Sequence, residues 1–285
     1  MIGITTFGDN RLKRSLKRFQ TQSHSIDIFD EISINSDDDL PLWYRQEHAE
    51  RLIRGSRGFG YWCWKPFIIL QTLKNMPALD MLFWCDAGCH VRPQGRDRMS
   101  EYIEAFKVSS CDLLAFQGSI DGVYFDYDGR KLPDGTEAHW TKGDLFHAFK
   151  IDKDHPHAHS TQFGAGIFGV KNNSTVKDML QTWVDLTRDS PFLFNDENSM
   201  EPNLSGFIAN RHDQSYFSLC AKTMGAVRFS AFEYWYPESN EKGSDILSVA
   251  PDWKTIDRSP FHAMRDRPIA PWWRAVNAAR RLFMT

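Results

Sequence analysis

The five residues from Met81 to Cys85 are all apolar, and the run ends at Asp86. A short apolar run followed by polar and turn residues is typical of a strand that is buried on both faces of a sheet. Burying a carboxylate without a partner is costly, so we expect a ligand, a cation or several amides around Asp86. A structural cap on a neighbouring turn is the alternative interpretation of this residue.

Strand-like and helix-like segments alternate along the rest of the chain. Strands are predicted at 2–7, 25–34, 81–86, 112–117, 162–170 and 227–235, and helices at 11–22, 43–53, 66–74, 102–107, 174–187 and 212–224. This alternation predicts an α/β fold with a mostly parallel central sheet flanked by helices. Ligands of such sheets bind outside the carboxyl ends of the strands, where Asp86 is expected to lie.

Length and composition limit the possible classes of protein. The chain has 285 residues and a formal net charge of −3, which gives no general attraction to nucleic acid. We expect one domain over 1–267, followed by a separate segment at 268–285. The sequence contains no apolar run of 18 residues, and its first residues lead straight into a strand, so we expect a cytoplasmic protein. The five cysteines are expected to be reduced thiols.

Three cations, Arg54, Arg57 and Lys65, stand around the start of the helix that contains Pro66. Arginine and lysine are the side chains that bind phosphate oxygens. A carboxylate at a strand end beside this basic helix start is the layout expected for a nucleotide-sugar site. For Lys65, a position on a solvated helix face is the alternative.

Five segments in this order carry a family resemblance: TTFGD from Thr5, RGFGYWCWKP from Arg57, FWCDAGC from Phe83, FGAGIFGVKN from Phe163 and HDQSYFS from His212. Together they resemble bacterial glycosyltransferases of the GT-A fold, of the type found in surface-polysaccharide and lipopolysaccharide biosynthesis. The resemblance covers residues 2–267. It implies a Rossmann-like GT-A domain and the transfer of a sugar, expected to be a hexose, from a nucleotide-sugar.

The resemblance also implies roles for particular residues. The first strand and its loop would cradle the base, through Thr5, Thr6 and Phe7. The segment CDAG would correspond to the acidic motif that holds the ribose and a divalent metal. Its three positions here are Asp86, Ala87 and Gly88. Gly88 departs from that motif, in which the third position is usually an acid.

Metal binding therefore has two alternatives. Asp86 could hold Mn²⁺ or Mg²⁺ together with diphosphate oxygens and water, with His262 or His212 completing the set of ligands. Alternatively, the leaving diphosphate could be neutralised without metal by four cationic side chains, which are Lys65, Arg57, His262 and Arg265.

The glycine-studded strand would pass beneath the donor sugar, according to the same resemblance, through Gly164, Ala165 and Gly166. The segment HDQ, with His212 and Asp213, would face the acceptor. Asp213 is the candidate base or sugar-orienting carboxylate, and Lys65 a candidate for stabilising the leaving group. An acid at the start of a helix is also favoured by the macrodipole alone, which is the structural alternative for Asp213.

Two further segments have distinctive compositions. The segment HPHAH contains His155, His157 and His159, which we predict to lie on a solvent-facing loop without metal. The segment 268–285 is predicted to form a short basic amphipathic helix, with Trp272 and Trp273 near arginines. It could lie on the anionic inner face of the cell membrane as a peripheral anchor, or dock on the core of the protein.

The prediction is therefore a hexosyltransferase that moves a sugar from a nucleotide-sugar, expected to be a UDP-sugar, to a bacterial surface glycan or lipid-linked acceptor. The alternative is a noncatalytic protein with a degenerate GT-A site that binds glycans or nucleotide-sugars. A nucleotidyltransferase is less favoured, because no glycine-rich basic loop follows the first strand. Retention or inversion at the anomeric carbon stays open.

Overall fold

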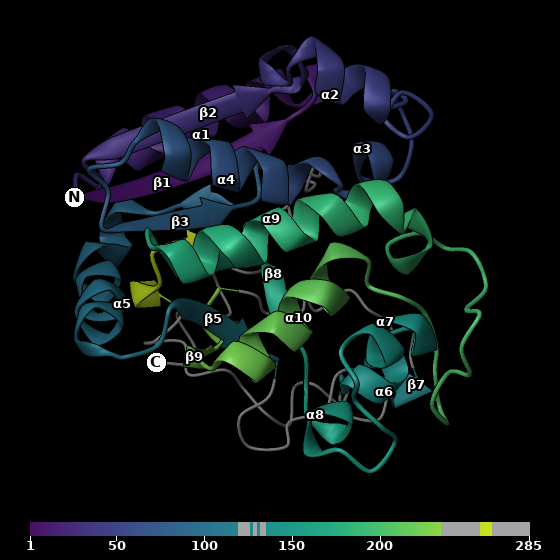
Figure 1. Cartoon of the computed structure of the whole chain (residues 1–285). Helices are drawn as coiled ribbons and strands as arrows, with labels where there is room; N and C mark the ends of the chain where they lie inside the picture. Colours follow the sequence, from purple (N-terminus) through teal and green to yellow (C-terminus); the bar gives the residue numbers. More distant parts are fainter. Residues whose placement is uncertain (119–125, 128–129, 132–134, 235–256, 264–285) are drawn as a thin grey trace.

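The computed structural model describes residues 1–118, 126–127, 130–131, 135–234 and 257–263 (Figure 1). Its centre is a six-stranded sheet in the order β2-β1-β3-β8-β5-β9. In chain order these strands are β1 (Ile2–Gly8), β2 (Glu31–Ser36), β3 (Met81–Cys85), β5 (Leu113–Gln117), β8 (Phe163–Lys171) and β9 (Ala226–Ser230). Strand β8 runs antiparallel to both of its neighbours, and every other pair is parallel. The predicted α/β fold with a mostly parallel sheet is thus confirmed.

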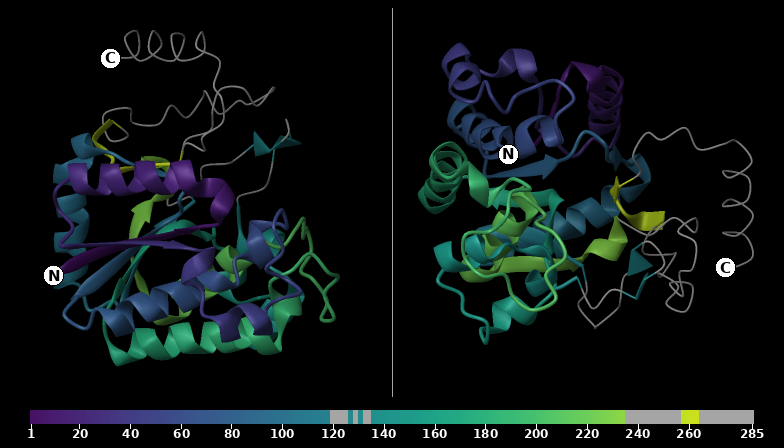
Figure 2. Two further views of the ribbon diagram at one scale, coloured as in Figure 1. Left: turned by 90° about the horizontal axis from the view of Figure 1, so that it is seen from above. Right: turned by 90° about the vertical axis from the view of Figure 1, so that its right-hand side faces the viewer.

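Helices cover both faces of this sheet. The long helices are α1 (Lys13–Ser25), α4 (Trp64–Asn75), α5 (Arg96–Val108), α9 (Ser174–Asp189) and α10 (Asp213–Met224). Seen from above in Figure 2, α1 lies on one side of the sheet, and α4 and α9 lie on the other. Helix α10 packs on β8 and β5, on the side of α4 and α9.

The remaining described elements are short. The helices are α2 (Leu42–Glu47), α3 (Gly58–Tyr61), α6 (Glu137–Trp140), α7 (Gly143–Ala148) and α8 (Pro156–His159). The 3-10 helices are η1 (Asn10–Leu12), η2 (Asp37–Asp39), η3 (Pro93–Gly95), η4 (Pro191–Leu193) and η5 (Ala231–Glu233). The short strands form two pairs, β4 (His90–Val91) with β10 (Phe261–His262), and β6 (Asp126–Tyr127) with β7 (Arg130–Lys131).

Two hydrophobic cores result from the alternation of side chains along the strands. In β3, Leu82 and Trp84 face the core beneath α4, α9 and α10, whereas Phe83 and Cys85 face the core beneath α1 and α5. Because successive side chains of a strand point to opposite faces, a continuous apolar run fits a strand that is covered on both sides.

Several predicted boundaries differ from the structure. The second strand begins at Glu31, because the residues before it complete α1 and a turn. The helix predicted at 43–53 ends at Glu47, and the one predicted at 102–107 begins earlier, at Arg96. The histidine motif is largely the short helix α8 rather than a loop. An apolar pattern does not indicate where a helix begins or ends to within a few residues.

Some predictions fall outside the described residues, namely Arg265, Trp235 and the whole segment 268–285. All five cysteines are free thiols, as expected. Over the described ranges, no helix has the length and apolarity needed to cross a membrane.

Candidate functional site

A buried lysine joins two carboxylates at the carboxyl end of β3. The ammonium group of Lys65 lies 3.3 Å from Asp86 Oδ1 and donates a hydrogen bond to Asp213 Oδ2. It also donates to the carbonyl oxygen of Ala165, at 3.0 Å. The Lys65 side chain is 1% exposed. Residues from three distant parts of the chain are thereby brought into one ion cluster.

The position of Lys65 follows from the packing of α4. This helix is buried on nearly all sides between the sheet and α9, so a side chain in its first turn cannot reach bulk solvent. Pro66 follows directly, in the first turn, where its missing amide hydrogen is no loss. The Lys65 ammonium also lies 5.3 Å from the ring centre of Trp84. The alternative of a solvated lysine is excluded by this burial.

Asp86 is the exposed member of the cluster. Its amide donates to the carbonyl oxygen of Gly166, at 2.8 Å, which fixes the residue at the end of β3. Its side chain is 36% exposed, and two groups, Trp84 Nε1 at 2.9 Å and Lys65, contact Oδ1. A Cβ atom added to Gly166 would lie 3.4 Å from Oδ2. The glycine therefore leaves room beside the second carboxylate oxygen.

The charges of the cluster influence one another. Burial raises the pKa of Asp213 to about 6; Lys65 opposes this rise, and the charge of Asp86 adds to it. Burial by itself would lower the pKa of Lys65, but attraction to Asp213 and Asp86 raises it above its ordinary value. The lysine thus stays charged at neutral pH, and Asp213 titrates close to neutrality. Perturbed carboxyls of this kind concentrate at functional sites.

His212 connects this cluster to a second one. Its Nε2 lies 2.9 Å from Asp196 Oδ1, and Arg57 Nη1 lies 3.1 Å from the other oxygen of the same carboxylate. His212 has a φ of 56° and a ψ of −120°, a conformation that is strained for a residue with a side chain. Arg57, one of the predicted diphosphate contacts, lies beside Asp196 in this structure.

The predicted glycine strand lies against the site. Ala165 is 2% exposed and accepts the Lys65 hydrogen bond through its carbonyl group. A Cβ atom on Gly164 would lie 2.4 Å from the hydroxyl oxygen of Tyr234. A side chain at this position would therefore displace the hydroxyl of Tyr234, which the sequence did not indicate as a site residue.

Residues predicted for the base are buried. Asn35 donates to Thr5 Oγ1 at 3.0 Å and to the carbonyl oxygen of Thr6 at 2.9 Å. Phe7 is 2% exposed and stacks on Trp64 with ring centres 4.0 Å apart. These side chains shape the end of β1 from within the core.

The other predicted positions lie around the acidic turn. Ala87 is buried, and its carbonyl oxygen accepts from Arg18 Nη2 at 2.7 Å; Gly88 is half-buried. His262 is 8% exposed and pairs with His90 between β10 and β4. Within the ranges the structure describes, no group of three or more His, Cys, Asp or Glu side chains is placed to hold a metal ion.

Asp196 is the main site residue that sequence analysis missed. It lies in a polar stretch after α9 that has no motif and no periodicity. The HDQ segment indicated its partner, His212. The sequence therefore pointed to one residue of this contact and not to the other.

Neither protein-family models nor curated proteins gave a match to this sequence. Solved structures did. A glycosyltransferase involved in the glycosylation of the major capsid of PBCV-1 is similar at 10% identity, over 92% of each chain, with a TM-score of 0.49. The galactosyltransferase LgtC is similar at 11% identity over 98% of this chain and 93% of that one, with a TM-score of 0.45. Mouse xyloside xylosyltransferase 1 is similar at 10% identity over 93% and 96%, with a TM-score of 0.42. The α/β fold itself rests on the strand order given above.

Proposed function

We propose that the chain is a glycosyltransferase that moves a sugar, expected to be a hexose, from a nucleotide-sugar to a glycan acceptor. The single observation that carries this proposal is the contact of Lys65 with both Asp86 and Asp213 at the carboxyl ends of the strands. An exposed carboxylate, a buried carboxylate that titrates near neutrality and a glycine-lined strand meet there. Carboxylates of these two kinds can bind sugar hydroxyls and accept a proton from an attacking hydroxyl group.

The three charged residues have different roles in the proposal. Asp86, the exposed carboxylate, binds ribose or sugar hydroxyls. Asp213 orients the sugar, or accepts the proton of the attacking hydroxyl when it is ionised above pH 6. Lys65, also a candidate for stabilising the leaving group, holds the two carboxylates in place in this proposal, because its buried ammonium group contacts both of them.

A divalent cation, Mn²⁺ or Mg²⁺, would fit beside the Oδ2 oxygen of Asp86. Both contacts that the described residues make to the Asp86 carboxylate go to Oδ1, and Gly166 keeps the space near Oδ2 open. Asp86 would hold the ion, with His262 as the second proposed ligand and with diphosphate and water oxygens as the others. When bound, the ion would neutralise charge on the leaving diphosphate.

The proposal extends to the donor, to the acceptor and to the location of the protein in the cell. We propose a UDP-sugar as donor and a bacterial surface glycan or lipid-linked glycan as acceptor, on the resemblance of the motifs that include Asp86 and Asp213 to enzymes of that type. Peripheral contact with the inner membrane would be made by the segment 268–285.

Turnover of the donor tests the proposal. Purified protein is incubated with UDP-glucose, UDP-galactose and UDP-N-acetylglucosamine, with and without Mn²⁺, and the UDP that is released as the sugar is transferred to water is measured. We expect release by the wild type and by Glu104→Gln, a control at an exposed acid on α5, and at least a hundredfold less by Asp213→Asn. Binding of a nucleotide-sugar without release would instead favour the noncatalytic binding protein.

A further inference from the structure

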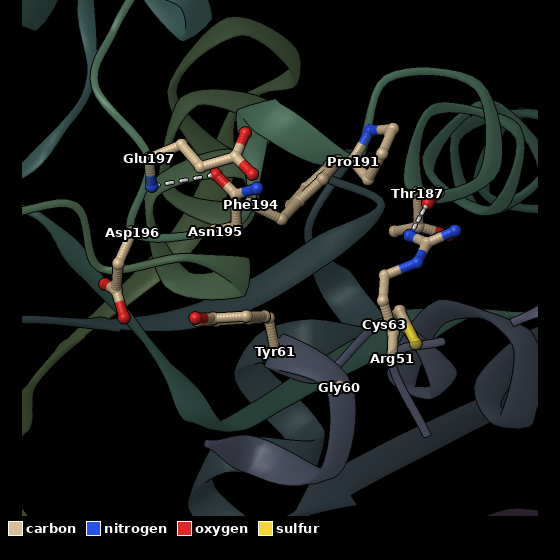
Figure 3. Close-up of a pocket in the computed structure, with 10 residues that line it drawn as sticks. All are labelled: Arg51, Gly60, Tyr61, Cys63, Thr187, Pro191, Phe194, Asn195, Asp196 and Glu197. Carbon is tan, nitrogen blue, oxygen red and sulfur yellow. Dashed lines mark hydrogen bonds between the residues drawn. The ribbon is translucent and has the colours of Figure 1, made fainter. Parts of the chain in front are cut away.

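A cavity of about 340 Å³ lies between α3 and the loop that follows α9 (Figure 3). Its apolar lining includes Cys63, Pro191 and Phe194, and its polar lining includes Tyr61, Asp196 and Glu197. Ligand pockets are mostly apolar with a few placed polar groups, and this volume is at the lower end of their range. One small ring fits such a space better than a longer chain does.

The backbone that carries Tyr61 into this cavity is strained. Gly58, Phe59, Gly60, Tyr61 and Trp62 follow one another with positive φ values of 57°, 49°, 92°, 54° and 58°. They form a left-handed turn, in which the Trp62 amide donates to the Gly58 carbonyl at 3.2 Å. A left-handed conformation costs about 1–2 kcal/mol for each residue with a side chain. Strain of this kind is found at functional sites, where the surrounding structure holds it.

Asp196 has a fixed orientation on the opposite wall of the cavity. Arg57 and His212 bind its carboxylate, and the Tyr61 hydroxyl points toward it in Figure 3. Burial would raise the pKa of Asp196, but hydrogen bonding and attraction to His212 and Arg57 lower it, so it is an anion at neutral pH. Its side chain is nevertheless 46% exposed, which leaves it accessible to a ligand.

His212 ties this cavity to the ion cluster described above. It is followed directly by Asp213, the proposed catalytic carboxylate, and its ring stacks on Tyr61 with centres 5.3 Å apart. A molecule in the cavity would therefore lie close to the residues that fix the start of α10.

We propose that this cavity binds one uncharged sugar ring of the acceptor glycan, an inference that rests on the proposed function. Sugar hydroxyls donate hydrogen bonds to Asp196 and Glu197, and the apolar lining receives the C–H face of the ring. The charged residues that line the cavity are two carboxylates, Asp196 and Glu197, and one cation, Arg51. Their net negative charge disfavours an acidic sugar, because like charges repel. The cavity therefore selects neutral over acidic acceptors.

Binding without any donor tests the inference first. Saturation-transfer NMR is recorded with methyl glucoside, methyl galactoside, methyl mannoside and methyl glucuronide. We expect at least one neutral glycoside to bind the wild type and the control Glu104→Gln, and the glucuronide to bind more weakly. Asp196→Asn and Glu197→Gln should weaken the neutral glycoside about tenfold, the effect of losing a hydrogen bond to a charged group. Glu197 is exposed, so its variant is expected to fold.

Donor turnover then separates this inference from the proposed function. With the best glycoside as acceptor, Glu197→Gln should raise the acceptor KM and leave the donor KM unchanged. The inference is overturned if no neutral glycoside binds, if the variants bind it as the wild type does, or if the glucuronide binds equally well. Glycoside binding that is lost in the variants, with no UDP released from any donor, would support the cavity and refute the transferase. UDP release without glycoside binding would support the transferase and refute the proposed role of the cavity.

Discussion

Replacing Lys65 by methionine should destabilise the protein in a way that grows with pH. The substitution keeps an unbranched side chain of similar length and removes the buried ammonium group, with its charge and its hydrogen bonds to Asp213 and to the Ala165 carbonyl oxygen. It leaves Asp213, whose side chain is 8% exposed, without its cation. Breaking a buried ion pair from one side costs about 3–5 kcal/mol.

The pH dependence follows from the pKa of Asp213. An aspartate in an unfolded chain has a pKa of about 3.9, whereas in the folded protein burial raises that of Asp213 to about 6. The folded state binds this proton more tightly, so the free energy of unfolding falls by about 3 kcal/mol as the pH rises from about 4 to 6. Above pH 6 the wild-type contribution is constant. Without Lys65 the pKa rises further, and the decline continues by about 1.4 kcal/mol per pH unit.

Urea unfolding at pH 6.0 and 7.5 measures this difference. We expect the loss of stability in Lys65→Met, relative to the wild type, to be about 2 kcal/mol larger at pH 7.5 than at pH 6.0. Lys74→Met is the matched control, because Lys74 is exposed on the same helix. A loss that is the same at both pH values would refute the account, since Asp213 would then not be a buried acid held charged by this lysine.

Three further predictions concern other positions. Burial lowers the pKa of His48 to about 4, so acidification from pH 6.5 to 4 should reduce the free energy of unfolding. In His48→Phe this reduction should be smaller by roughly 3 kcal/mol, as measured by urea unfolding. Gly166→Ala places a Cβ atom 3.4 Å from Asp86 Oδ2, and calorimetry should show severalfold weaker nucleotide-sugar binding at an almost unchanged melting temperature. Glu137→Gln leaves the buried ammonium of Lys222, 2.8 Å away, without its anion, and should cost about 3 kcal/mol; an unfolding curve like the wild type would contradict this.

The strand that ends before Asp86 could be predicted because its signal is local. Five apolar residues followed by an acid fit a strand between two helical layers. All the residues that give this signal are adjacent in the sequence. For the strand predicted at 25–34, the local signal gave the wrong start, because the structure begins this strand at Glu31. Alternating apolar residues there belong partly to the end of α1 and to a turn, which hydrogen bonds define and an apolar pattern does not.

The contacts within the site were not predictable in this way. Lys65 and Asp213 were each candidates, but they are 148 positions apart in the sequence. Their ion pair depends on how α4 packs on β1 and α9, and on how α10 packs on β8. The left-handed turn that carries Tyr61 was equally hidden, because tyrosine and tryptophan do not favour that conformation. Tertiary packing holds both features.

The central claim is that Asp86 belongs to a site for a nucleoside diphosphate sugar. A thermal-shift screen of UDP, GDP, CDP and UDP-sugars, each with and without Mn²⁺, on wild type and Asp86→Ala tests it most directly. A ligand that binds only the folded state raises the melting temperature. We predict that a uridine nucleotide stabilises the wild type, more strongly with Mn²⁺, and does not stabilise Asp86→Ala. Equal stabilisation of both proteins, or of neither at millimolar nucleotide, would contradict the assignment of this site.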